Sequence, residues 1–155
     1  EYFFPLKEVN EEFAFKSIKV VDDIDQVKSQ FDMWEQIIIK LEYFVKKRIT
    51  GSIIAVSIHQ GGEPIVKSYD SDYSDDQFKA RNVGNYVSWI KLPMNTLKIG
   101  TYTISLGCSR PIDREDFGTY QDVIKFEIIS NENIAYKSYG ISPGVIISRI
   151  PWKYD

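Results

Sequence analysis

The sequence is poor in the side chains that carry covalent chemistry. It has one cysteine, Cys108, and one histidine, His59, among 155 residues. A single cysteine excludes a framework of internal disulfides and favours a reducing compartment. Nucleophilic catalysis needs a base beside a serine, threonine or cysteine. Nothing in the sequence brings His59 and Cys108 together, so the sequence gives no support to this kind of catalysis.

Several longer patterns are also missing. No apolar run approaches the length of a membrane span, and no signal peptide is recognisable. Neither a GxxxxGK[ST] phosphate loop nor a GxGxxG turn occurs, which argues against nucleotide hydrolysis and leaves no cofactor to expect. The net charge of -3 gives no electrostatic reason to expect nucleic acid as a partner. Because the chain opens on Glu1 rather than methionine, we expect an excised domain or a processed product.

An acidic stretch between residues 70 and 76 resembles a calcium loop only in part. Asp70 and Asp72 have the alternate spacing of oxygen ligands, but Asp75 stands where such a loop needs glycine. Arg81 stands where the loop needs its distal glutamate. The sequence favours a solvated acidic loop here, with calcium binding left open.

Hydrophobic residues alternate with polar ones through most of the chain. That period of two is typical of half-buried β-strands. The pattern predicts about eight short strands and no convincing helix, at residues 13–21, 34–46, 53–59, 64–69, 84–92, 101–108, 122–129 and 145–150. We therefore predict an all-β, immunoglobulin-like (jelly-roll-like) antiparallel sandwich. Residues 1–12 form an N-terminal arm or linker, and residues 13–155 form the sandwich domain.

The phase of each strand predicts which side chains face inward. Twelve apolar residues share the inward phase: Ile37, Ile39, Leu41, Ile54, Val56, Ile58, Ile90, Leu92, Ile104, Leu106, Phe126 and Ile128. Trp89 falls out of phase with Ser88, Ile90 and Leu92, so its indole should point outward. Three polar segments, residues 22–32, 70–82 and 109–121, are predicted to be loops, the first with room for one helical turn.

Aromatic and polar residues in outward or loop positions predict a binding surface for sugars. Sugars present apolar C–H faces and hydroxyl rims, so their sites pair aromatic rings with polar side chains. The candidate glycan-binding residues are Trp34, His59, Tyr69, Trp89, Arg110, Asp113, Arg114 and Tyr120. We expect the site where the outward strands carrying Trp89 and His59 meet the loop 109–121, with Trp89 stacked on a sugar ring.

Each candidate has a structural alternative. An aromatic residue can pack into the core or under a loop, and for Trp34 and Trp89 the two interpretations are evenly balanced. Asp113, Glu115 and Asp116 share one segment with Arg110 and Arg114. Paired carboxylates suit glycoside hydrolysis, but mixed charges in one loop more often form ion pairs with one another.

Three stretches of the sequence resemble a known family. They are SWIKLPMNTLKIGTYTISLGC (residues 88–108), YQDVIKFEII (120–129) and GVIISRIPW (144–152). The shared pattern is a strand ending in Leu-Pro, a Leu-x-x-Gly-Thr-Tyr turn, an aromatic-centred strand and a terminal Gly-to-Trp segment. AVSIHQGGEPIVK (55–67) adds a weaker match. The pattern resembles the C-terminal carbohydrate-binding domain of the ATP-binding subunit of O-antigen polysaccharide ABC exporters (the Wzt type).

The resemblance implies a non-catalytic module that binds the exported glycan, often at its modified end. It implies the exporter's transmembrane subunit as a partner through the parent protein, and a cytoplasmic position at the inner face of the bacterial inner membrane. It also implies a homodimer, which we expect to involve residues 144–152. Two rival functions remain: a carbohydrate-active enzyme with loop carboxylates, and a protein–protein adhesion module.

Overall fold

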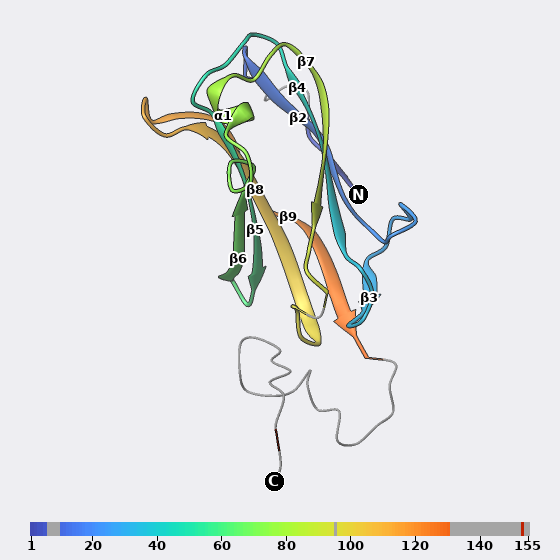
Figure 1. Cartoon of the computed structure of the whole chain (residues 1–155). Helices are drawn as coiled ribbons and strands as arrows, with labels where there is room; N and C mark the ends of the chain where they lie inside the picture. Colours follow the sequence, from blue (N-terminus) through green and yellow to red (C-terminus); the bar gives the residue numbers. More distant parts are fainter. Residues whose placement is uncertain (6–9, 95, 131–152, 154–155) are drawn as a thin grey trace.

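The chain folds into two facing β-sheets. The computed structural model describes residues 1–5, 10–94, 96–130 and 153. Within these residues one sheet has the order β1-β2-β4-β7 and the other the order β3-β9-β8-β5-β6. The first sheet contains β1 (Tyr2–Phe3), β2 (Phe13–Val21), β4 (Ile38–Val45) and β7 (Gly84–Lys91). The second contains β3 (Gln30–Asp32), β9 (Glu115–Ile129), β8 (Gly100–Arg110), β5 (Ile53–Gln60) and β6 (Glu63–Tyr69). The predicted all-β sandwich is confirmed (Figure 1).

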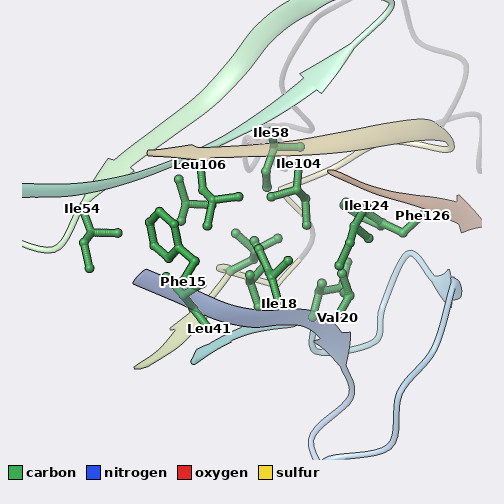
Figure 2. Close-up of a cluster of buried hydrophobic side chains, with 14 of the residues drawn as sticks. Phe15, Ile18, Val20, Leu41, Ile54, Ile58, Ile104, Leu106, Ile124 and Phe126 are labelled. Carbon is green, nitrogen blue, oxygen red and sulfur yellow. The ribbon is translucent and has the colours of Figure 1, made fainter. Parts of the chain in front are cut away.

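The core lies between the two sheets. Figure 2 shows side chains such as Ile58 and Ile104 of one sheet facing Ile18 and Leu41 of the other. Of the twelve residues predicted to face inward, all except Ile90 are buried. Ile90 is half-buried and packs against the core from β7, a strand that ends its sheet. The period of two therefore identified the core correctly.

Two strand predictions need correction near residue 34. β4 begins at Ile38 rather than Trp34, because the chain turns at residues 32–35 as it passes from one sheet to the other. The Asp32 side chain stabilises this turn by accepting a 3.0 Å hydrogen bond from the Trp34 amide. The expected loop 22–32 also contains β3, which pairs in parallel with β9. Three residues are too few to show a periodic pattern.

The expected loop 109–121 is wrong. β8 continues to Arg110 and β9 begins at Glu115, so only a four-residue turn separates them. The register shifts between Cys108 and Ser109 and again between Ile104 and Leu106, and Asp122 has a positive φ of 50°. These bulges interrupt the alternation of side chains. Because the alternation is interrupted, residues 109–121 have the sequence pattern of a loop although most of them are paired in the β8–β9 hairpin.

The remaining connections are short or locally structured. The loop 70–82 contains one helical turn, α1 (Asp76–Lys79), which was not predicted. Part of the expected N-terminal arm joins the sandwich, since Tyr2 and Phe3 pair with β2 and Phe4 is buried. The expected strand 145–150 lies outside the described residues. Over the described ranges, no helix is long and apolar enough to cross a membrane.

Arg81 ties the two sheets together at one end of the sandwich. Its side chain is fully buried, and its Nη2 lies 2.6 Å from Asp70 Oδ2. Its Nε donates to Ser52 Oγ at 3.1 Å, and its Nη1 donates to Tyr43 OH at 3.0 Å. Burial opposes the charge of the guanidinium, but attraction to Asp70 outweighs burial and holds the pKa of Arg81 above its ordinary value.

Cys108 is fully buried on the inner face of β8, where burial raises the pKa of its thiol to about 12. The thiolate is the reactive form, so a thiol that stays protonated and buried reacts slowly. We expect the native chain at pH 8 not to react with a disulfide reagent such as DTNB, and to react fully in urea. The matched control is Cys108→Ala combined with Ser109→Cys, which moves the thiol to the adjacent outer-face position. Equal native rates for the two chains would contradict the burial of Cys108.

Candidate functional site: a groove on the outer face of the five-stranded sheet

The outer face of the five-stranded sheet carries an open groove of about 390 Å³. Its floor is made by small residues in register on β5 and β8, where Ala55 faces Gly107 and Ser57 faces Ser105. A Cβ atom at Gly107 would lie 3.1 Å from Thr119 Oγ1, so the close approach of β9 favours glycine there. The groove follows directly from a row of short side chains between strands that carry longer ones.

The walls of the groove carry aromatic and hydrogen-bonding side chains. β6 contributes Lys67 and Tyr69, and β9 contributes Thr119 and Gln121. His59 lies near the C-terminal end of β5, and its Nε2 lies 2.9 Å from Ser57 Oγ. The Lys67 ammonium lies 5.3 Å from the centroid of the Tyr69 ring. Hydroxyl, imidazole, ammonium and amide groups thus surround a shallow trough, with the Tyr69 ring at its edge.

The contact between Ser57 and His59 does not by itself make a catalytic pair. Ser57 and His59 have the contact of a nucleophile and its base, but acyl transfer also needs a group that orients the base and donors for an oxyanion. Among the described residues, no carboxylate hydrogen-bonds to His59. The backbone of β5 is paired on both sides, by β6 and by β8. In the same part of the chain, no three His, Cys, Asp or Glu side chains cluster as metal ligands would.

Comparison with known proteins gives a match of fold. No protein-family model matches the sequence, and no curated protein matches it in sequence. The crystal structure of the C-terminal domain of Wzt superposes with a TM-score of 0.73, covering 95% of this chain and 86% of that chain at 14% identity. The chain has the fold of the Wzt C-terminal domain. A Niemann-Pick type C2 protein from the Japanese carpenter ant matches less well, with a TM-score of 0.50, 9% identity, and coverage of 77% of this chain and 94% of that chain.

Of the candidates named from the sequence, His59 and Tyr69 lie in the groove of this Wzt fold. Tyr120 also lines it, but its ring packs 4.7 Å from Phe4 and 6.0 Å from Phe15, centroid to centroid. The Tyr120 ring therefore packs against other aromatic residues. Three of the eight candidate residues therefore line one groove, and their role in binding stays a prediction.

Trp89 points outward as its phase predicted, with 59% of its surface exposed. It lies on β7, however, in the sheet opposite to the one that carries His59. Its ring is covered in part by Lys40, whose Nζ lies 5.5 Å from the centroid. The single site that was expected to join Trp89 and His59 does not form. Strand phase distinguishes inward from outward but does not say to which sheet a strand belongs.

The other candidates lie away from the groove. Arg110 forms ion pairs with Glu12, Asp113 and Glu115 at 3.3–3.5 Å, so it holds the β8–β9 hairpin against the N-terminal segment. Arg114 is exposed in the turn with a φ of 54°. Trp34 is half-buried and packs against the core.

Three of the four aspartates of the acidic loop have partners within the chain for their carboxylates. Asp70 pairs with Arg81, and Asp75 pairs with Lys79 at 2.8 Å. Asp72 accepts hydrogen bonds from the Tyr69 amide at 2.8 Å and from the Ser68 hydroxyl at 3.2 Å. These contacts close the loop that follows β6 and position Tyr69 beside the groove.

Sequence reasoning missed the floor of the groove. Ala55 and Ser57 alternate with the inward residues Ile54, Val56 and Ile58, so strand phase places them outward. In the same way Ser105 and Gly107 alternate with Ile104 and Leu106. A row of small outward residues on two strands, flanked by larger ones, indicates a hollow when the strands are neighbours. The hollow could not be predicted because strand phase does not show that β5 and β8 are neighbours in the sheet.

Proposed function

We propose that this chain is a non-catalytic glycan-recognition domain, which binds an O-antigen polysaccharide and gives an ABC exporter its substrate specificity. The observation that carries the proposal is the open groove on a Wzt fold, floored by small residues and edged by Tyr69.

The groups in the groove match the surface of a sugar. The apolar C–H face of a pyranose stacks on an aromatic ring, and Tyr69 offers one at the edge. Sugar hydroxyls both donate and accept, and serine, threonine, glutamine and histidine do the same. Ser57, Thr119, Gln121 and His59 supply these groups from two strands.

The same proposal places the domain in its wider assembly. It works as part of an exporter's ATP-binding subunit at the cytoplasmic face of the inner membrane, beside the transmembrane subunit. The parent forms a homodimer through residues 144–152, which lie outside the described residues. Light scattering of the chain with and without these residues distinguishes a dimer from a monomer.

A second candidate function rests on the opposite face. Trp89 and Val87 are 59% and 42% exposed and adjacent in phase on β7, and exposed apolar residues that gather on one face mark contact sites for proteins. An adhesion or interaction module would use this face and leave the groove empty.

Replacement of Tyr69 tests the two functions against each other. We expect Tyr69→Ala to weaken binding of the O-polysaccharide from the source organism about tenfold, because it removes the stacking ring. Trp89→Ala, an exposed aromatic on the other sheet, is the matched control and should leave affinity unchanged. Calorimetric titration measures both, with urea unfolding to verify the fold. Loss of binding in Trp89→Ala but not in Tyr69→Ala would move the site to the opposite face.

A further inference from the structure

We propose that the groove selects a glycan carrying negative charge, as a carboxylate or phosphate substituent, and that Lys67 binds this substituent. The inference rests on the proposed glycan-binding function and adds the chemical class of the ligand. The groove is lined by one lysine and one histidine and by no aspartate or glutamate of the described residues. This contrasts with the whole chain, in which 22 acidic residues outnumber 19 basic ones.

Lys67 and two neutral hydrogen-bonding residue types, serine and histidine, gather at one end of the groove. Lys67 faces Ser57 directly across the β5–β6 ladder. Ser57 in turn contacts His59, with 2.9 Å between Oγ and Nε2. An ammonium, a hydroxyl and an imidazole therefore stand together over the same two strands. Oxygen atoms of a carboxylate or phosphate accept hydrogen bonds from all three kinds of group.

Lys67 differs from Lys40 and Lys79 in its partner. Lys40 pairs with Asp25 at 2.7 Å and Lys79 with Asp75 at 2.8 Å. Across the described ranges, Lys67 has no carboxylate within ion-pair distance. Its ammonium lies over the Tyr69 ring instead, an arrangement that directs the charge toward the groove without neutralising it.

The acidic residues on or next to the strands of the groove walls do not line the groove, and three of them already accept hydrogen bonds. Asp116 accepts from Thr119 Oγ1 and from the Gly118 amide, and Asp122 accepts from Thr103 Oγ1. Asp72 is bound by the amide of Tyr69, and Glu63 is exposed at the start of β6. Lys67 thus stands at the β6 wall of the groove, while Asp116 and Asp122 on β9 are held by donors of the chain itself. We expect the anionic group of the ligand over β5 and β6, beside Lys67, and its neutral hydroxyls near Thr119 and Gln121.

The test compares the O-polysaccharide with the same material after carboxyl reduction and, separately, after removal of phosphate by hydrofluoric acid. We expect one of these treatments to weaken binding to the unmodified chain about tenfold, and the responding treatment identifies the substituent. Lys67→Gln should weaken binding of the native polysaccharide by the same factor and have no further effect on the neutralised form. Lys125→Gln is the matched control, because Lys125 is exposed on the same sheet beside Thr103 but does not line the groove.

Two results would overturn the charge selection while leaving glycan binding intact. One is equal affinity for the native and both neutralised polysaccharides. The other is an equal effect of Lys67→Gln and Lys125→Gln, which would indicate a general charge effect. Failure of every form of the polysaccharide to bind would instead overturn the proposed function itself.

Discussion

Replacing Arg81 with alanine is expected to lower the free energy of unfolding by about 3 kcal/mol or more. The change removes a fully buried side chain that bonds to Tyr43, Ser52 and Asp70. It leaves the Asp70 carboxylate without its cation and Tyr43 and Ser52 without a donor, and it opens a cavity at the end of the sandwich. Urea unfolding followed by tryptophan fluorescence measures the loss.

Two further variants show that the buried network is the cause. Arg48→Ala removes an exposed arginine and should change stability by less than about 0.5 kcal/mol. Arg81→Met combined with Asp70→Asn removes both charges while filling the space, and should cost less than Arg81→Ala. A loss as small in Arg81→Ala as in Arg48→Ala would contradict the role of Arg81 as a tie between the sheets.

Filling the floor of the groove is expected to abolish recognition of the glycan. In Ala55→Trp, an indole would occupy the trough between Tyr69 and Gly107 and exclude the ligand. Since Ala55 faces outward from β5 and tryptophan is well accepted in strands, the fold should persist. We expect affinity for the O-polysaccharide to fall about 100-fold, or about 2.7 kcal/mol.

The control for this variant introduces the same side chain on the opposite face. Val87→Trp adds an indole at an exposed position of β7, in the other sheet. Its affinity for the polysaccharide should equal that of the unmodified chain. If Ala55→Trp binds normally and Val87→Trp does not, the groove is not the site.

The core and the strand phases could be predicted because one physical rule determines both. A strand with one buried face must alternate, and the runs around Ile39, Val56 and Ile104 follow that alternation. The rule failed where bulges break the alternation, at Ser109 and Asp122, and where β3 is too short to show a period. The bulges explain why residues 109–121 were predicted to be a loop although most of them are paired in a hairpin.

The site could be predicted only in part, for a different reason. His59 and Tyr69 were found because outward aromatic and polar residues are recognisable from phase alone. Trp89 was predicted to share their site because strand phase does not show which strands are neighbours. Strand order places Trp89 on one outer face and His59 on the other. Lys67 was not among the candidates because nothing in the sequence distinguishes it from other exposed lysines. Only the structure shows that it lines the groove.

The most direct test of glycan binding in the groove is an amide spectrum of the chain titrated with the O-polysaccharide. We predict that the resonances that shift or broaden belong to Ala55, Ser57, Gly107 and Thr119, on three adjacent strands of one sheet. The amides of Val87 and Trp89 should stay in place. Shifts confined to Val87, Trp89 and their neighbours on β4, with the groove unchanged, would contradict the account.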